Sequence, residues 1–270
     1  ENTNKKIMNL LVDKDKNIIF TTCFFHLEDW KCKSADQYFQ LFTQLCQTKI
    51  NLVVYTSNCY YDNVKEISSA YPNVLLIVKI ELNDLNIAKL VAKQVAKQGI
   101  NINLPTIRNL EKDKISYFIC MNSKFELVKR TLEMSNQAII PLAKNYGWID
   151  FGIFYVFKQS EITSAKLTRI SEYSFPDNFI SFPGCVFSQP IFQTVLNKFV
   201  IWRFCGGFFI ISASLIDKYY TLITKYFDEN IKSGKITWEV NIWAGAEQKY
   251  NLDFGWYLAD HNDSIINIQL

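Results

Sequence analysis

Continuous apolar runs alternate with segments of helical periodicity through the first part of the chain. Residues 18–25 (IIFTTCFF), 51–55 and 73–80 have the uninterrupted Val, Ile, Leu and Phe content of strands buried on both faces. The segments between and after them, 34–48, 62–70 and 84–97, repeat apolar residues at helical spacing. Strands that alternate with helices in this way predict βαβ units and a parallel sheet.

The pattern changes in the second part of the chain, where apolar runs follow one another with less helical sequence between them. We expect strands at 115–121, 151–157, 180–182 and 200–204, and helices at 124–134 and 215–230. The sequence therefore predicts an α/β fold with a mostly parallel central sheet in its first half and mixed strands in its second. No linker or internal repeat divides the chain, so we expect a single domain over residues 1–270, with halves at about 17–157 and 158–270.

Composition supports a globular chain and argues against some partners. The 270 residues are 49% hydrophobic and 20% charged, which is ample for a sizeable core. The net charge is +3, and no block of Lys and Arg is interleaved with aromatic residues, so no nucleic-acid partner is expected. No apolar run reaches the roughly 20 residues of a bilayer span, so no transmembrane segment is expected, although peripheral membrane contact stays open.

Seven Cys are scattered without a CxxC pair. An odd number of Cys without regular spacing is typical of a reducing compartment, and the same lack of spacing argues against a structural zinc site. The polar start, residues 1–6, lacks the pattern of a secretory signal peptide. These features predict a cytoplasmic protein, either free or at the inner face of a membrane.

The stretch 147–152 (GWIDFG) places Asp150 at the end of an apolar strand and a bare backbone at Gly152. A buried acid is costly unless it is paired, hydrogen-bonded or bound to a cation. At the carboxyl end of a strand it suits a metal–phosphate ligand. A turn acid that bonds its own backbone is an equal alternative from these residues alone.

Two further candidates are each open to two interpretations. His261, in the segment DHND, could join Asp150 as a metal ligand better suited to manganese than to magnesium, or could cap a turn. Glu239 follows Trp238 in apolar surroundings and could be a general base, or a first-turn acid favoured by the helix dipole.

Three further candidate site residues are Gly206 and Gly207, which leave the backbone bare, and Lys124, which carries a charge. The glycine pair could let a ligand lie on the backbone, or could mark a bulge. Lys124, at a predicted helix start, could hold an anion or be a solvated lysine. A Walker-type loop, a GxGxxG fingerprint and a GxSxG elbow are all absent from the sequence, which argues against common ATPases, Rossmann dehydrogenases and α/β-hydrolases.

The order of these segments resembles a known family. The segments are Lys124-Phe125, WIDFG at 148–152, Gly206-Gly207-Phe208, Trp238-Glu239-Val240 and YLADHNDSI at 257–265. Over about residues 18–268 the chain resembles the HtrL/YibB/WlaTC family of bacterial and viral proteins, described as glycosyltransferases. That family in turn is similar to GT-A glycosyltransferases, so the resemblance implies a GT-A-like fold with a nucleotide-sugar half and an acceptor half.

The resemblance also implies roles for individual residues. Asp150 and His261 would hold a divalent cation, Mn²⁺ or Mg²⁺, and Glu239 would be the catalytic base. The implied donor-site residues are Thr21, Thr22, Lys124, Trp148, Asp150 and Gly152, and the implied acceptor-site residues are Gly206, Gly207 and Trp238. The chain departs from the usual Asp-x-Asp motif, because Gly152 stands at the third position.

The activity implied is that of a metal-dependent hexosyltransferase. It would move a sugar from a nucleoside diphosphate sugar, expected to be a UDP-sugar, to a hydroxyl of a glycan or lipid-linked glycan. The family association places such a reaction in surface polysaccharide, lipo-oligosaccharide or glycoprotein assembly. The alternative is a non-catalytic module that binds a nucleotide sugar or a glycan, which the missing second Asp favours.

Overall fold

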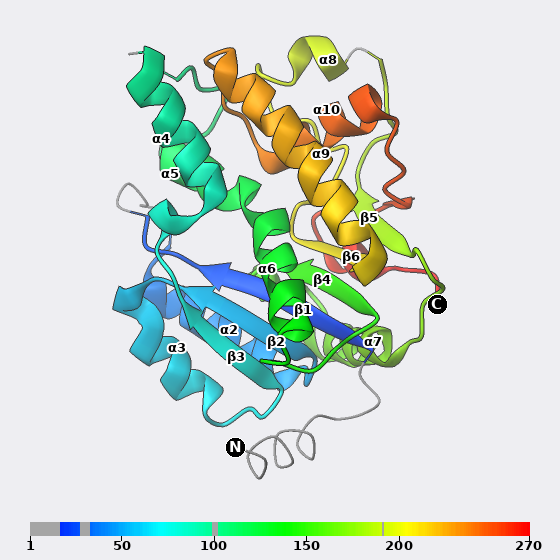
Figure 1. Ribbon diagram of the computed structural model, residues 1–270. Coiled ribbons are helices and arrows are strands. Elements are labelled where there is room, and N and C mark those ends of the chain that lie inside the picture. The colour runs from blue at the N-terminus through cyan, green and yellow to red at the C-terminus, as the bar shows by residue number, and fades with distance from the viewer. Residues whose placement is uncertain (1–16, 28–32, 99–101, 191) are drawn as a thin grey trace.

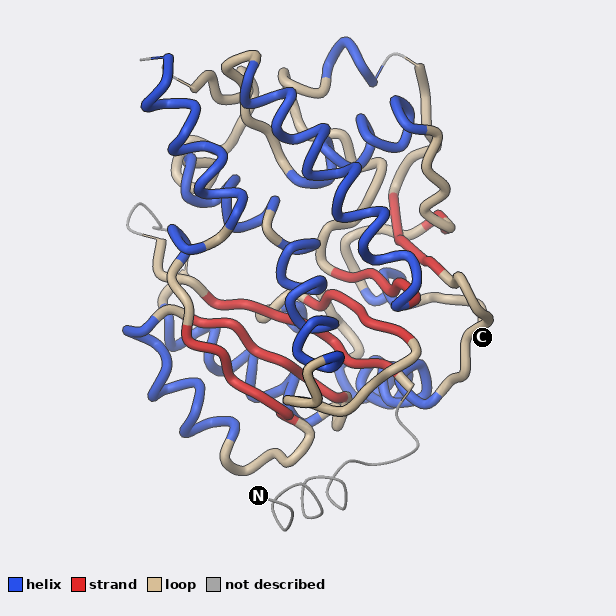
Figure 2. Tube along the Cα trace, viewed as in Figure 1, coloured by secondary structure: helices blue, strands red, loops and turns tan. Residues whose placement is uncertain are grey.

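The structure is a computed structural model that describes residues 17–27, 33–98, 102–190 and 192–270 (Figure 1). The polar start at 1–6, Cys32 and the first part of the segment at 99–110 lie outside the described residues. A seven-stranded sheet of order β3-β2-β1-β4-β6-β5-β7 runs through the described chain, with helices on both of its faces (Figure 2). The α/β class predicted from the sequence is therefore confirmed.

The first half of the sheet is parallel. Its strands are β1 (Ile18–Phe24), β2 (Asn51–Thr56), β3 (Val74–Lys79) and β4 (Asn145–Ile149), and all adjacent pairs among them run in the same direction. The helices that connect β1 to β2 to β3, and the helix that follows β3, are α2 (Ala35–Gln47), α3 (Tyr61–Ser68) and α4 (Asn86–Gln98). Every residue of β2 is buried, as its continuous apolar run predicts.

The second half of the sheet is mixed, as predicted. Strand β6 (Phe208–Ser212) is antiparallel to both β4 and β5 (Ile180–Gly184), and β7 (Trp256–Leu258) is parallel to β5. Strand β4 is therefore the member of the sheet at which the direction of pairing changes. It forms parallel pairs on one side and antiparallel pairs on the other.

The sheet separates two apolar cores. Alternate residues of each central strand point to opposite faces, so Ile19 and Val53 join one core and Phe20 and Leu52 join the other. The first core lies under α6 (Lys124–Asn136), α9 (Ala213–Lys232) and α10 (Glu239–Tyr250), and the second under α2 and α7 (Ser160–Glu172). Figure 1 shows α6 lying across the front of the sheet and α2 behind it.

Three predicted strands are absent from the described residues. Residues 115–121 belong instead to α5 (Ile115–Asn122), because a short apolar run also suits a buried helix and Phe118, Ile119 and Cys120 are all buried in it. Residues 151–157 form a turn and the short helix η3 (Ile153–Tyr155), which begins where the Ile153 N–H donates to the carbonyl of Asp150. Residues 200–204 form a loop, and the Ile201 N–H donates to Asn241 Oδ1 rather than to a strand.

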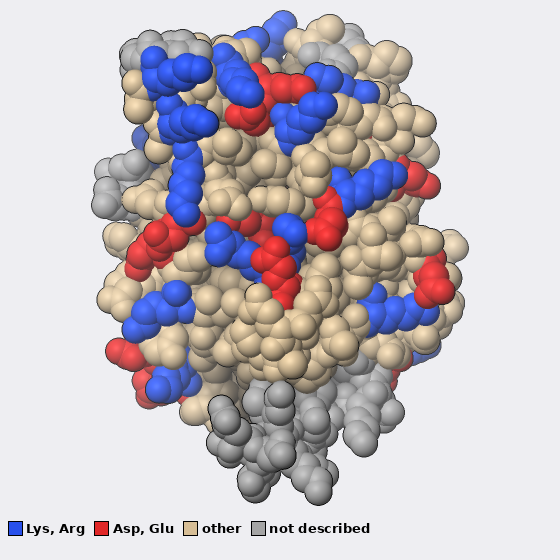
Figure 3. All heavy atoms as spheres, in the orientation of Figure 1, with Lys and Arg blue, Asp and Glu red and all other residues tan. Residues whose placement is uncertain are grey.

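The remaining short elements are α8 (Phe192–Val195), η1 (Asn58–Tyr60), η2 (Leu82–Asp84) and η4 (Asp263–Ile266). Among the helices that the structure describes, none combines the length and the apolar content needed to cross a bilayer. Figure 3 shows basic and acidic side chains interspersed on one face, with a column of basic side chains over α4, where Lys89, Lys93 and Lys97 are exposed.

Candidate active site

A cavity of about 590 Å³ opens at the carboxyl ends of β1 and β4. Its walls include the residues that follow β1, the residues that follow β4, and the first residues of α6 and α10. The antiparallel strand β6 begins at the same edge, where Gly206 and Gly207 also line the cavity. The carboxyl edge of parallel strands is where open α/β sheets bind ligands, so this cavity is the candidate active site.

Lys124 lies at the floor of this cavity and is almost fully buried. Its ammonium Nζ donates to Glu239 Oε1 at 2.9 Å and to the Gly206 carbonyl at 2.8 Å, and forms a salt bridge to Asp150 Oδ1 at 3.1 Å. An ammonium has three hydrogens to donate, and here it has three acceptors. Lys124 is therefore held by the protein itself, and is not the solvated lysine of the simpler interpretation.

The surroundings of Lys124 keep it charged. Burial alone lowers its pKa, but the nearby carboxylates of Asp150 and Glu239 outweigh burial, and the net effect raises the pKa above its ordinary value. The ammonium also lies 5.4 Å from the centre of the Trp148 ring. Lys124 thus provides a fixed positive charge between two carboxylates.

Asp150 follows the last residue of β4, as the sequence predicted. Its backbone N–H donates to the carbonyl of Gly207 at 2.9 Å, which continues the pairing of β4 with β6. Its Oδ1 accepts a hydrogen bond from Trp148 Nε1 at 2.7 Å in addition to the contact with Lys124. The side chain is 38% exposed, so Asp150 is the member of the group that faces solvent.

Glu239 is the first residue of α10 and is 5% exposed. Glu239 is therefore the first-turn helix acid of one interpretation, and it also lines the cavity, while its role as a general base stays a prediction. With Asp150 and Lys124 it forms a cluster of two carboxylates and one ammonium. The formal charge of this cluster is negative when both acids are ionised.

The glycine pair is explained by the charged cluster. A Cβ on Gly206 would lie 2.2 Å from Glu239 Oε1, and a Cβ on Gly207 would lie 2.9 Å from Ile153 Cδ1 and 3.4 Å from Asp150 Oδ2. A side chain at Gly206 would crowd the Glu239 carboxylate, and a side chain at Gly207 would crowd Ile153 and reach van der Waals contact with Asp150. The structure places the two glycines where the backbone must approach these acids closely.

Gly152, Trp148 and Trp238 also lie at the cavity, as expected for residues of a binding site. A Cβ on Gly152 would come within 2.9 Å of the Tyr38 ring. Trp238 donates from Nε1 to Asp113 Oδ1 at 3.3 Å, which fixes its ring at the start of α10. These three residues are thus brought together with Lys124 and Asp150.

The structure does not bring Thr21 and Thr22 to the cavity. Both are fully buried within β1, and the Thr21 hydroxyl donates to Thr131 Oγ1 at 2.9 Å. The chain reaches the cavity only beyond them, through Cys23 and the residues that follow. A direct contact of either threonine with a nucleotide is therefore not supported by this geometry.

Aromatic side chains of the cavity wall were missed by the sequence analysis. They are Phe24, Phe25, Tyr38, Tyr60, Tyr117, Phe151, Tyr155 and Trp202. The high aromatic content, 15% of the chain, was the available signal, but it did not indicate which rings share a wall. Rings of this kind can stack on a nucleobase or on the apolar face of a sugar.

The two predicted metal ligands, Asp150 and His261, both line the cavity but belong to different groups. Within the described ranges, the one group of three or more His, Cys, Asp or Glu side chains close enough to share an ion is Cys185, Cys205 and His261. Asp150 instead contacts an ammonium, which already supplies a positive charge there. The residues around Asp150 therefore do not form the oxygen-rich set that Mg²⁺ or Mn²⁺ prefers.

Comparisons with known proteins give no family assignment. No family model matches the chain, and no curated protein matches it, so the resemblance to the HtrL/YibB/WlaTC family stays a prediction. Some solved structures share part of the architecture. They include 4-diphosphocytidyl-2C-methyl-D-erythritol synthase from Anaerococcus prevotii, with a TM-score of 0.43, 10% identity, and coverage of 95% of this chain and 93% of that one.

Two further similar structures are mouse xyloside xylosyltransferase 1 and a cytidylyltransferase from Leptospira borgpetersenii. The first has a TM-score of 0.39 and 9% identity, and covers 90% of this chain and 85% of that one. The second has a TM-score of 0.35 and 13% identity, and covers 81% of this chain and 73% of that one. Because all three TM-scores are below 0.5, these structural similarities do not support any inference about function.

Proposed function

We propose that this chain is a glycosyltransferase that moves a sugar from a nucleoside diphosphate sugar to a hydroxyl of a glycan acceptor. One observation carries the proposal. The buried ammonium of Lys124 holds Glu239 and Asp150 together at the floor of an aromatic-lined cavity, at the carboxyl edge of the parallel strands. Such a site offers rings for a nucleotide or sugar and charged groups for acid–base chemistry.

Glu239 is suited to the role of base in this reaction. The bond from the sugar's anomeric carbon to the diphosphate oxygen breaks, and its electron pair leaves with the diphosphate. A bond forms from the same carbon to the acceptor oxygen, and the hydrogen of that hydroxyl passes to the Glu239 carboxylate. Lys124 fixes the position of Glu239 through the 2.9 Å hydrogen bond to Oε1.

Lys124 and Asp150 have separate roles in the proposed site. Lys124 stays protonated because the two carboxylates raise its pKa, so it offsets part of their negative charge at the end of the cavity where a diphosphate would leave. Asp150 is the exposed acid, fixed by Trp148 and Lys124, and is placed to accept hydrogen bonds from sugar hydroxyls. The glycine pair lets a substrate approach without a side chain between it and these acids.

The donor and acceptor classes are further parts of the proposal. We expect a UDP-sugar as donor and a glycan or lipid-linked glycan as acceptor, as the family resemblance implies. The divalent cation that the family resemblance implies, Mn²⁺ or Mg²⁺, is assigned no step in the proposed reaction, because the residues around Asp150 offer few oxygen ligands. A cytoplasmic location and contact with the inner face of a membrane belong to the same proposal.

A non-catalytic module that binds a nucleotide sugar or glycan is the second candidate, and one observation favours it. All three acceptors of the Lys124 ammonium are protein atoms, so an anion would have to displace one of them to bind it directly. In a binding module the cluster would only shape the floor of the cavity.

The deciding experiment combines binding with turnover. Thermal shifts with UDP, GDP, CDP, TDP and CMP, each with and without Mn²⁺, identify the nucleotide and the metal requirement. The matching nucleotide sugars are then incubated with the protein, and release of the free nucleotide (a nucleoside diphosphate, or CMP from a CMP-sugar) is measured. Release above the blank supports the transferase. Binding without release supports the module, and no response to any nucleotide contradicts both the transferase and a module that binds nucleotide sugars.

A further inference from the structure

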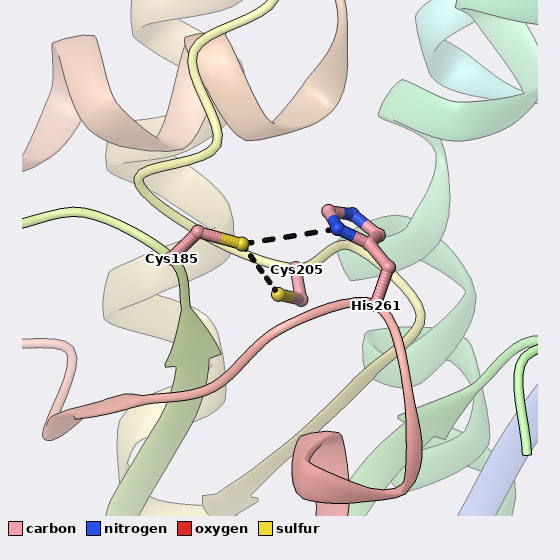
Figure 4. A group of neighbouring side chains, drawn as sticks. All are labelled: Cys185, Cys205 and His261. Atoms are coloured by element: carbon pink, nitrogen blue, oxygen red, sulfur yellow. Dashed lines mark hydrogen bonds between the residues drawn. The ribbon is translucent and has the colours of Figure 1, made fainter.

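A second cluster lies beside the candidate active site, and the proposed reaction does not use it. Cys185 Sγ is 3.6 Å from Cys205 Sγ and 3.8 Å from His261 Nδ1 (Figure 4). One ligand atom from each residue lies within 4.8 Å of the other two. Asp260 Oδ1 adds an oxygen 3.9 Å from Cys185 Sγ and 3.5 Å from His261 Nδ1.

The sheet topology brings these residues together from three segments. Cys185 follows β5 directly, and its N–H donates to the carbonyl of Trp202 at 2.9 Å. Cys205 lies at the end of the adjacent loop, and its N–H donates to the carbonyl of Pro183 at 2.7 Å. Because β7 is parallel to β5, with Leu258 beside Gly184, the residues that follow β7 lie next to Cys185.

The backbone of the third segment is also fixed. The Ala259 N–H donates to the carbonyl of Gly184 at 2.9 Å, and the Asp260 N–H donates to Ser264 Oγ at 2.8 Å. The His261 ring packs edge-on against Trp202, with centroids 4.1 Å apart. All three ligand-bearing segments therefore have fixed backbones before any ion binds.

Two of the three ligand separations are close to the edges of a small tetrahedral site, and the third, between Cys205 and His261, is within 4.8 Å. Zinc binds sulfur at about 2.3 Å and imidazole nitrogen at about 2.0–2.1 Å in tetrahedral geometry, which puts two sulfurs roughly 3.8 Å apart and a sulfur and a nitrogen about 3.6 Å apart. The distances of 3.6 Å between the two sulfurs and 3.8 Å between sulfur and nitrogen are close to these values. Two thiolates and an imidazole are ligands that select zinc over magnesium or calcium.

We propose that Cys185, Cys205 and His261 bind a zinc ion at the edge of the active-site cavity, with Asp260 or water as the fourth ligand. Binding would replace the two thiol protons by the metal. The ion would link the end of β5, the loop before Gly206 and the segment after β7. His261 would then be a metal ligand, as the sequence predicted, but with two cysteines in place of Asp150.

A disulfide between Cys185 and Cys205 is the main rival. It would need the two sulfurs to approach to about 2.05 Å and would leave the positions of His261 and Asp260 unexplained. In the reduced protein a zinc site would still bind an ion, whereas a disulfide would be converted to two thiols.

The test is a Co²⁺ titration of the fully reduced protein, followed by displacement with Zn²⁺. We expect a thiolate-to-cobalt charge-transfer band that saturates at one ion per chain and disappears when Zn²⁺ is added. The variant Cys185→Ser should lose most of the band, and His261→Gln should weaken binding at least tenfold. The control Cys59→Ser removes an exposed cysteine outside the cluster and should leave the band unchanged.

Three results would overturn the zinc site. They are the absence of a band in reduced wild-type protein, a full band in Cys185→Ser, and loss of the band in Cys59→Ser. Thermal shift with Zn²⁺ gives an independent measurement, since a bound ion stabilises the folded state and Cys185→Ser should abolish that gain. None of these measurements depends on sugar transfer, so the zinc site and the proposed function can fail separately.

Discussion

Lys124 and Glu239 are 115 residues apart in the chain and form a buried hydrogen-bonded ion pair of 2.9 Å. Each is the first residue of its helix, Lys124 of α6 and Glu239 of α10. The pair therefore joins the starts of two helices over the end of β4, where Asp150 completes the cluster.

Glu239→Gln tests the proposed base. The amide keeps the shape of the side chain but cannot take up the acceptor proton, so transfer should fall by about 10²- to 10⁴-fold while donor binding changes little. Sugar transfer and donor affinity are measured on the same preparations. A variant that loses donor binding instead would make Glu239 a donor-site residue.

Glu126→Gln is the matched control for that variant. Glu126 is a buried glutamate paired with Arg130 at 2.8 Å, but it does not line the cavity. Its loss should lower stability while leaving transfer by the folded protein near wild type. Equal losses of transfer in both variants would assign the effect to folding.

Lys124→Met tests how far the ammonium supports the fold. Removal leaves Glu239 buried without its partner and the Gly206 carbonyl without a donor, which should reduce the free energy of unfolding by about 3–5 kcal/mol. The double variant Lys124→Met/Glu239→Gln should recover part of this loss, since the unpaired charge is gone. Denaturant unfolding of wild type, the two single variants and the double variant gives the coupling free energy between Lys124 and Glu239. Strictly additive changes in unfolding free energy would contradict a direct interaction between them.

The raised pKa of Lys124 fixes the pH range in which this contribution acts. The folded state holds the proton more tightly than the unfolded state, so the contribution is complete below the unfolded value of 10.5 and declines as pH rises above it. The difference in unfolding free energy between wild type and Lys124→Met should therefore be constant from neutral pH to about pH 9.5. A difference that declines near pH 7 would contradict a raised pKa.

Gly206→Ala and Gly207→Ala should differ in effect. A Cβ on Gly206 meets the carboxylate of Glu239, which Lys124 holds in place, whereas a Cβ on Gly207 first meets the end of the Ile153 side chain. We expect Gly206→Ala to lower transfer and thermal stability more than Gly207→Ala. Activity assays and melting curves on both variants test this order, and the reverse order would place the more critical contact at Gly207.

Much of the fold could be predicted from apolar runs. The first three strands are buried on both faces and bounded by clear helical periodicity, so β1, β2 and β3 were found close to their true limits. The segment at 115–121 was misassigned because a short, uniformly apolar run does not distinguish a buried strand from a buried helix. The strand β7, of three residues, was too short to leave a pattern.

The candidate site was predicted in part. Asp150, Glu239 and the glycine pair stood out because each breaks an apolar run, but their link through Lys124 depends on contacts between distant segments. The cluster of Cys185 and Cys205 with His261 was missed for the same reason. Its residues are 20 and 76 positions apart, and they become neighbours only through the backbone hydrogen bonds between the two cysteine segments and the pairing of β5 with β7.

The distance along the chain between Lys124 and Glu239 also has a consequence for biosynthesis. Before residue 239 leaves the ribosome, a nascent chain can form β1 to β4. The salt bridge between Lys124 and Asp150 can then form as well. The second carboxylate arrives only with α10, so the site is completed after the strands β1 to β4 have been synthesised. A fragment that stops before α10 would retain the parallel strands but would leave a buried ammonium with one acid instead of two.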